Sequence, residues 1–324
     1  MMRWGGAALG ALASASLAAP SMAAPSGDPA APYIGRWDVT LQTPQRAYSS
    51  WLDIEQDGRG LKVRMVGRWG HARWLPSARV EDGRIRFVSP KEEEGRKDDM
   101  VFEGARSGDA LVGRTTGPDG TVWTWRAVRA PSLARKRAPR WGAPIRLFDG
   151  HDLQGWSLID AAKTSWRATD GALVSSGGGS DLRTMATFQD FKLHLEFNCA
   201  KGANSGVYLR GRYEVQIEDD LEPEGPTMRT GGVYGYLAPS SPAPRTPGVW
   251  RSYDITLVGR RVTVVLDGKT LIDNAEIPGI TGGALDSREG LPGPLVLQGS
   301  EAGQVAYRNI VLTPARSTHK SWKE

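Results

Sequence analysis

The stretch FKLHLEF, residues 191–197, decides the fold, because apolar and polar side chains alternate at every position. Successive side chains of a strand point to opposite faces, so Phe191, Leu193, Leu195 and Phe197 are expected to face the core together. No part of the sequence sustains the 3.6-residue period of an amphipathic helix. The stretch therefore predicts a strand of an antiparallel sheet with one buried face.

Residues that favour turns are frequent along the whole chain, both before and after this predicted strand. Gly (40 residues) and Pro (21 residues) are frequent among the 324 residues, and both interrupt helices and build turns. The predicted fold class is therefore all-β, with strands joined by short turns. Asp-Gly pairs supply the positive-φ residues of tight hairpins, and six are present: Asp57-Gly58, Asp82-Gly83, Asp119-Gly120, Asp149-Gly150, Asp170-Gly171 and Asp267-Gly268.

The composition excludes several kinds of site. Cys199 is the single cysteine beside four histidines, so an intrachain disulfide, an iron–sulfur cluster and a Cys-based zinc site are excluded. The formal net charge of +5 is spread along the chain, apart from one basic run. A nucleic-acid-binding protein gathers such charge on one element. We therefore expect no nucleic-acid partner, and the residues assign no metal ligands.

The N-terminal residues 1–23 have the features of a secretory signal peptide. Arg3 precedes an uncharged stretch, residues 5–19, and small residues then lead to an expected cleavage after Ala23. The stretch is too short and too rich in Ala, Gly and Ser for a membrane span, which needs about 20 strongly apolar residues. We therefore expect a periplasmic or secreted protein that starts near Ala24.

Two β domains are expected after this segment. Residues 31–130 hold about seven short strand candidates, which is typical of a small antiparallel barrel or sandwich. Residues 131–143 carry the basic run Arg135-Lys136-Arg137 between two prolines, as a solvated linker does. Residues 144–314 are expected to form the second domain, and residues 315–324 a C-terminal tail.

Several motifs occur in a fixed order in the second domain: NSGVYLRG (204–211), YEVQI (213–217), GVYG (232–235), TGGA (281–284) and RNI (308–310). Together they make residues 144–314 resemble the 3-keto-disaccharide hydrolase family. The resemblance implies a concanavalin-like jelly-roll β-sandwich made of two curved antiparallel sheets. It also implies cleavage of glycosides whose sugar is oxidised at the 3-position.

Two positions depart from the pattern of the family that the chain resembles. Similar sequences commonly have Asp-His after the Leu-Gln near the C-terminus, where this chain has Gly299-Ser300 after Gln298. The residue before Trp250 is Val249, at a position where an acid is common in the family. If the missing histidine takes part in catalysis in relatives, this chain has a shifted substrate or binds sugar without turnover.

The acidic strand YEVQIE, residues 213–218, is the first element of the candidate site. Alternation directs Glu214, Gln216 and Glu218 to the face opposite the apolar side chains. A curved sandwich can hold an oligosaccharide on its concave outer face, and this face would present two acids and an amide. The alternative interpretation is an ordinary solvated face, which any antiparallel sheet has.

A second polar row is expected beside the acidic strand. Asn204, Tyr208 and Arg210 share one face if their segment is a strand, and they would complete the floor of a groove as substrate-binding residues. Two long loops rich in Pro and Gly, residues 219–232 and 236–249, are expected to border it. Long loops without regular structure are uncommon in compact domains unless they are functional.

The resemblance also assigns a role to Asp219, which lies where the family has an acid after the YEVQI motif. Its carboxylate would accept sugar hydroxyls or coordinate a divalent cation, and the alternative is a turn residue at the end of a strand. No cofactor is assigned with certainty beyond this possible cation. The predicted catalytic residues are Glu214 and Asp219, and Gln216 and Glu218 are predicted to bind substrate.

The substrate class implies a mechanism. A ketone at C3 acidifies the proton on C2, so a base can remove that proton while the group at C1 leaves, and water then adds to the enone. Glu214 is expected to act as base or acid, with Arg210 or a bound cation holding the ketone oxygen. Two alternatives stay open: a carbohydrate-binding protein without turnover, and an ordinary glycosidase with two carboxylates about 5–9 Å apart.

Overall fold

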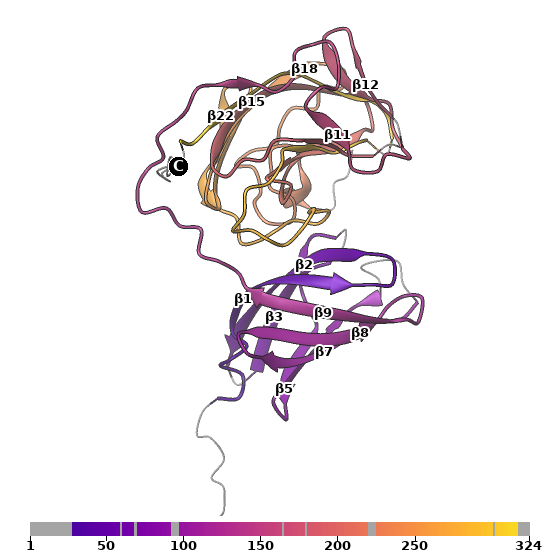
Figure 1. The fold of residues 1–324 in the computed structure, drawn as a ribbon, viewed down its shortest axis with the longest axis vertical. Coiled ribbons are helices and arrows are strands. Elements are labelled where there is room, and N and C mark those ends of the chain that lie inside the picture. The colour runs from indigo at the N-terminus through magenta and orange to yellow at the C-terminus, as the bar shows by residue number, and fades with distance from the viewer. Residues whose placement is uncertain are drawn as a thin grey trace, which may run out of the picture.

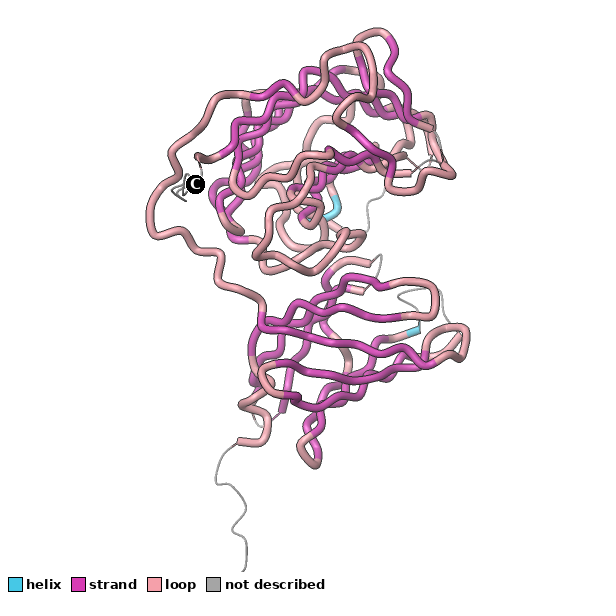
Figure 2. Tube along the Cα trace, viewed as in Figure 1, coloured by secondary structure: helices cyan, strands magenta, loops and turns pink. Residues whose placement is uncertain are grey.

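The structure is a computed structural model that describes residues 28–58, 60–67, 70–91, 97–163, 165–178, 180–219, 225–300 and 302–316. Strands and loops make up nearly all of these residues (Figure 2). The predicted signal peptide and most of the predicted C-terminal tail lie outside them. Within the described ranges, every helix is too short or too polar to cross a membrane.

The N-terminal unit is one antiparallel sheet of nine strands (Figure 1). The strand order is β4-β3-β2-β1-β9-β8-β7-β6-β5, and β3 also contacts β5, so the sheet curls into a barrel. Trp37, Ile54, Phe87 and Trp125 belong to the apolar cluster that fills its interior. The strands are β1 (Gly35–Gln42), β2 (Ala47–Asp57), β3 (Gly60–Val66), β4 (Ala72–Trp74), β5 (Ser77–Glu81), β6 (Arg84–Ser89), β7 (Met100–Ser107), β8 (Ala110–Thr116) and β9 (Val122–Arg129).

The C-terminal unit is a sandwich of two antiparallel sheets, which together with the barrel confirms the all-β fold class. The larger sheet has the order β12-β13-β22-β15-β18-β19-β20, with β10 paired to β22, and the smaller has the order β11-β14-β21-β16-β17. The elements are β10 (Ile145–Arg146), β11 (Trp156–Leu158), β12 (Trp166–Thr169), β13 (Ala172–Ser175), β14 (Leu182–Thr184), β15 (Phe191–Cys199), β16 (Asn204–Leu209), β17 (Tyr213–Glu218), the 3-10 turn η2 (Pro226–Met228), β18 (Trp250–Val258), β19 (Arg261–Leu266), β20 (Lys269–Glu276), β21 (Val296–Leu297) and β22 (Val305–Pro314).

Strand β15 lies inside the larger sheet, between β22 and β18. Its alternation is confirmed, because Phe191, Leu193, Leu195 and Phe197 are all buried while the residues between them are not. They belong to one hydrophobic core together with apolar side chains of the smaller sheet, such as Val215. Burial of each such side chain is worth about 1.5–3 kcal/mol, so this contact between the two sheets is the main stabilising feature of the sandwich.

The barrel packs directly against loops of the sandwich (Figure 1). Trp51 of β2 is fully buried and belongs to the hydrophobic core of the sandwich. Its ring meets Tyr236 edge-on at a centroid distance of 5.8 Å. It also lies against Gly279, where a β-carbon would come within 2.3 Å of the indole. The Ser49 hydroxyl donates to the Ala284 carbonyl at 2.5 Å, so the barrel holds the loop after β20 in place.

The segment between the two units also makes defined contacts. Arg135 donates to both carboxylate oxygens of Asp190, at 2.6 and 2.9 Å, and the side chain of Leu133 is buried. The Pro131 carbonyl accepts a hydrogen bond from Arg260 at 2.8 Å. This part of the chain is therefore anchored to the sandwich at these three points, while most of its residues, including Arg135-Lys136-Arg137, are exposed.

Candidate functional site

Strand β17 divides its side chains between two faces. Tyr213, Val215 and Ile217 are fully buried in the core of the sandwich, so Glu214 and Gln216 point to the other side of the sheet. That side is not an open groove, because Glu214 and Gln216 are each only 3% exposed. The prediction of the two faces is right, whereas the prediction of a solvent-facing polar trough is wrong.

The loop of residues 277–285, which we call the cover loop, encloses Glu214. The backbone N–H of Glu214 donates to Thr281 Oγ1 at 3.1 Å. The Tyr208 hydroxyl lies 2.9 Å from Glu214 Oε2 and 3.0 Å from the Gly282 carbonyl, and it can donate to either oxygen. The same loop contacts the barrel on its other side, so Glu214 and Tyr208 are separated from solvent by a layer that the barrel supports.

Burial changes the acid–base behaviour of this pair. Removal from water raises the pKa of Glu214 to about 8; the hydrogen bond from Tyr208 opposes that shift, and the negative charge of Asp181 adds to it. Burial also raises the pKa of Tyr208 far above its usual value. Glu214 therefore keeps its proton at neutral pH in this enclosed position.

Arg210 and Asn204 lie away from this enclosed pair. Arg210 follows β16 with a φ of 54°, so the chain leaves the strand before this residue. Its buried guanidinium donates to the Tyr213 hydroxyl at 3.0 Å and to the Gly259 carbonyl at 2.7 Å. Asn204 is exposed at the opposite end of β16. The predicted row of Asn204, Tyr208 and Arg210 therefore does not form.

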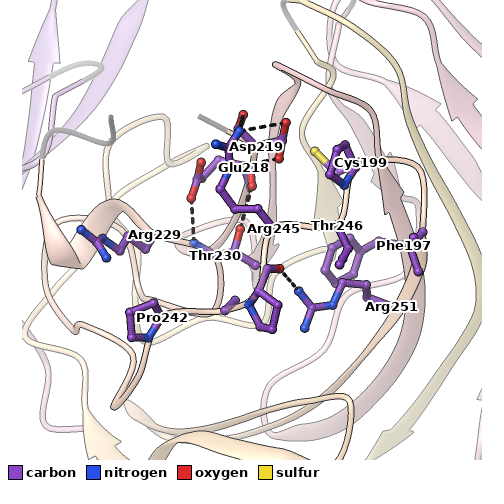
Figure 3. Close-up of a pocket in the computed structure, with 14 residues that line it drawn as sticks. Phe197, Cys199, Glu218, Asp219, Arg229, Thr230, Pro242, Arg245, Thr246 and Arg251 are labelled. Atoms are coloured by element: carbon purple, nitrogen blue, oxygen red, sulfur yellow. Dashed lines mark hydrogen bonds and ion pairs between the residues drawn. The ribbon is translucent and has the colours of Figure 1, made fainter. Parts of the chain in front are cut away.

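An open cavity of about 160 Å³ lies where the ends of β15 and β17 meet the start of β18 (Figure 3). Two of the predicted residues, Glu218 and Asp219, border it. The loop that connects β17 with β18 supplies most of the remaining wall. The other residues that line the cavity are Phe197, Cys199, Arg229, Thr230, Pro242, Ala243, Pro244, Arg245, Thr246, Pro247, Val249 and Arg251.

Asp219 is held by donors on both sides of its carboxylate (Figure 3). Arg245 donates from Nε to Oδ1 at 3.2 Å, and its Nη2 lies 3.1 Å from Oδ2. The backbone N–H of Gly202 also donates to Oδ2, at 3.1 Å. Charge-assisted hydrogen bonds of this kind fix geometry strongly, so Asp219 is suited to position Arg245 rather than to carry a proton.

Glu218 is anchored through its backbone beside the cavity. Its N–H donates to Thr230 Oγ1 at 3.0 Å, and the Thr230 hydroxyl lies 3.0 Å from the Glu218 carbonyl. Its side chain is only partly buried, and its Oε1 accepts a long hydrogen bond of 3.4 Å from the Thr230 N–H. Of the predicted acids, Glu218 and Asp219 thus border the open cavity, and Asp219 is the one that forms an ion pair with Arg245.

Three arginines of the cavity were missed by sequence reasoning. Arg245 pairs with Asp219, and Arg251 donates to Asp267 at 2.7 Å and to the Pro244 carbonyl at 2.6 Å. Arg229 differs, because its Nε is buried and has no hydrogen-bond partner in the described part of the chain. Arg229 and Arg245 lie in the two long loops that the sequence marks as functional. Their positive charges in these loops were the signal that could have identified them as site residues.

Among the described residues that line it, the cavity offers no set of ligands for a divalent cation. Both oxygens of Asp219 already face the guanidinium of Arg245, which supplies the positive charge there. Within the described ranges, no three His, Cys, Asp or Glu side chains come together as a metal site requires. Burial first, and the nearby acids second, raise the pKa of Cys199 to about 12, so its thiol is a poor metal ligand and a poor nucleophile.

Comparison with solved structures finds carbohydrate-related proteins of similar fold at modest similarity. A "putative glycosyl hydrolase" of Parabacteroides distasonis is 27% identical, covering 55% of this chain and 92% of that chain, with a TM-score of 0.46. A carbohydrate-binding module from Bacillus subtilis is 15% identical, covering 49% of this chain and 94% of that chain, with a TM-score of 0.35.

Sequence comparison gives a more specific relationship. A 3-keto-disaccharide hydrolase of Bacteroides thetaiotaomicron is 29% identical over 94 aligned residues, and the match covers 24% of this chain and 32% of that protein. The match thus spans about a third of the length of this curated relative. The model of the family described as 3-keto-alpha-glucoside-1,2-lyase-like domain matches residues 143–313, just over half of the 324 residues. The chain belongs to this 3-keto-alpha-glucoside-1,2-lyase-like family.

Proposed function

We propose that the chain cleaves glycosides whose sugar carries a ketone at C3, and that the reaction takes place in the cavity bordered by Glu218 and Arg229. Family membership supports the substrate class. The observation that carries the proposal is that one open cavity is bordered both by Glu218 and by Arg229, whose buried Nε has no hydrogen-bond partner among the described residues.

Glu218 is the proton carrier in this proposal. Its carboxylate removes the proton on C2, which the ketone at C3 acidifies, and the Arg229 guanidinium donates to the enolate oxygen that forms. As the bond between C1 and the leaving oxygen breaks, the proton on Glu218 passes to that oxygen. Water then adds to the enone, with hydroxyl on C1 and hydrogen on C2, and the net reaction is hydrolysis.

Asp219 and Glu214 have other roles in this proposal. Asp219 holds Arg245 at the cavity and acts as a positioning residue, since both of its oxygens accept hydrogen bonds from the protein. Glu214 is buried under the cover loop with Tyr208, so a substrate in the open cavity does not meet it. Gln216, which is equally buried, and Asn204 and Arg210, which lie elsewhere, are not assigned to the substrate.

A second candidate is a carbohydrate-binding protein without turnover. It is favoured by the pairing of Asp219 with Arg245, because this ion pair engages one of the two acids among the described residues that line the cavity. An ordinary glycosidase needs two carboxylates with separate tasks, so the same pairing disfavours that third alternative.

The test is release of 4-nitrophenol from a 4-nitrophenyl 3-keto-glucoside by the full chain and by two matched variants. Glu218→Gln is expected to lower turnover by about 100-fold or more, whereas Glu214→Gln keeps most of it. Binding of the ketone substrate without release would favour the binding protein. Normal turnover by Glu218→Gln, or loss of turnover in a stably folded Glu214→Gln, would move the proton carrier away from Glu218.

We also propose that the chain is exported to the periplasm or secreted. The support is the composition of residues 1–23, with Arg3 before an uncharged stretch and a small residue at Ala23. Expression in a bacterial host followed by fractionation is expected to give a mature protein that begins near Ala24 outside the cytoplasm. Full-length protein retained in the cytoplasm would contradict this proposal.

A further inference from the structure

A second cavity, of about 460 Å³, lies between the barrel and the sandwich. Strands β1 and β9 form one wall, where Asp38 is the cross-strand neighbour of Val128 and Thr40 is that of Arg126. Residues 287–291 of the sandwich form the facing wall. The volume is within the range of about 300–1,000 Å³ that is usual for small-molecule sites, and such sites favour domain interfaces.

Asp38 is the first feature of this cavity that points to a ligand. Its side chain is 4% exposed, and its Oδ1 makes no hydrogen bond within the described residues. A buried polar atom without a partner costs about 1–3 kcal/mol, which a ligand hydroxyl would recover. Burial, and after it the nearby Glu289, raise the pKa of Asp38 to about 9, so this side chain carries no charge at neutral pH.

The other acid of the cavity, Glu289, is already neutralised by the protein. Arg260 donates to its two carboxylate oxygens at 3.0 and 2.8 Å, and the Tyr213 hydroxyl donates to it at 2.6 Å. Burial alone would raise the pKa of Glu289, but Arg260 first, then a hydrogen bond with the Asp38 side chain and the one from Tyr213, hold it below its usual value. Glu289 therefore stays charged and paired, and it does not set the charge that a ligand experiences.

Two arginines of β9, Arg126 and Arg129, carry the remaining unneutralised charge of the cavity. Arg129 donates to the backbone carbonyls of Pro32, at 2.8 Å, and Ile34, and neither is charged. Arg126 is exposed, and among the described residues neither guanidinium has a carboxylate partner. The cavity is therefore positive on the side of β9, and it favours a negatively charged group on the ligand.

From these features we infer that the cavity between the two units binds a sugar acid, meaning a monosaccharide or disaccharide that carries a carboxylate. Arg126 receives the carboxylate, and Asp38 and the paired hydroxyls of Thr40 and Ser287, 3.1 Å apart, are available to the sugar hydroxyls. Val128 and Leu291, which are 45% and 49% exposed, offer an apolar wall to the carbon–hydrogen face of the ring.

Calorimetric titration of the full chain with D-glucuronate tests this inference. Binding is expected, and it should weaken by at least about tenfold in Arg126→Ala and at high salt, where exposed charges are screened. Arg84→Ala, which removes an exposed arginine of β6, three strands away from β9 in the sheet, is the matched control and should bind as the parent does. Glu218→Gln should also bind normally, which separates this site from the proposed catalytic cavity.

Four results would overturn the inference. Equal binding of D-glucose would show that the carboxylate is not recognised, and equal binding of inorganic phosphate would show that the sugar is not. Unchanged binding of D-glucuronate by Arg126→Ala, or its loss in Arg229→Ala, would place the ligand outside the cavity between the units. Thermal melting of each variant checks that the fold is kept, so a loss of binding is read only in folded protein.

Discussion

Strand β17 carries Glu214 and Glu218 on the same face, yet the structure gives the two acids opposite environments. Glu214 lies under the cover loop, where it is buried and accepts a hydrogen bond from Tyr208. Glu218, at the end of the strand, borders an open cavity beside Arg229. The difference comes from what covers the strand, because both side chains leave the sheet in the same direction. Changes at the enclosed pair should alter stability, and changes at the open cavity should alter turnover.

The largest expected effect is the dependence of stability on pH at Glu214. Its pKa is raised from 4.5 to about 8 in the folded protein, so the folded state binds more protons than the unfolded state between these values. The stability that the Glu214 proton contributes is therefore fully present below about pH 4.5 and is lost as pH rises through 8. The free energy of unfolding should fall by about 4 kcal/mol between pH 5 and 8. Urea unfolding at several pH values should show a steeper fall for the parent chain than for Glu214→Gln. Equal slopes would mean that Glu214 is not enclosed.

The next largest effect is expected from Gly206→Ala. A β-carbon at Gly206 would come within 2.3 Å of Glu214 Oε1, so the carboxyl must leave its place beside Tyr208. Overpacking of this kind costs about 1–3 kcal/mol, which denaturant unfolding measures. Gly60→Ala is the matched strand control, since its nearest contact is at an ordinary 3.6 Å. A similar small change in both variants would contradict the tight packing of this pair.

Tyr208→Phe should have a somewhat smaller effect on stability. The variant removes the hydroxyl that lies 2.9 Å from Glu214 and 3.0 Å from the Gly282 carbonyl, so a buried acceptor loses the single hydrogen that this hydroxyl donates. The expected loss is about 1–2 kcal/mol in the free energy of unfolding, with turnover little changed. A large loss of turnover at unchanged stability would show that the enclosed pair meets the substrate.

The smallest free-energy change is expected at the open cavity, where it appears in turnover. Arg229→Ala removes a guanidinium whose Nε has no partner among the described residues, so unfolding should change by less than about 0.5 kcal/mol. The value of kcat/KM for a 3-keto-glucoside should fall by about tenfold or more, since a donor to the enolate is lost. Unchanged kcat/KM would remove Arg229 from the proposed mechanism.

Much of the fold follows from local patterns in the sequence. The alternation of Phe191, Leu193, Leu195 and Phe197 predicts the buried face of β15, because strand geometry alone sets that period. The same rule assigns the core face of β17. The Asp-Gly pairs mark hairpins for a similar local reason: Asp82, Asp170 and Asp267 have positive φ in the structure, as tight turns require.

The candidate site was less predictable, because exposure depends on segments distant in the sequence. Alternation could direct Glu214 outward, but it could not reveal that residues 277–285 and the barrel cover it. The strand assumed through Arg210 ends one residue earlier in a left-handed turn, which reverses the direction of its side chain. Arg245 reaches Asp219 across 26 residues of chain, and no local pattern encodes that pairing.

Through Trp51, the barrel also contributes to the stability of the sandwich. The indole completes the hydrophobic core of a neighbouring unit, so a C-terminal fragment produced alone would expose the apolar surface that this ring covers. In the full chain, the barrel and the sandwich should therefore melt together in a single calorimetric transition instead of two. An exchange of N-terminal units between relatives would succeed only where the incoming barrel brings an aromatic ring of similar size to the same place.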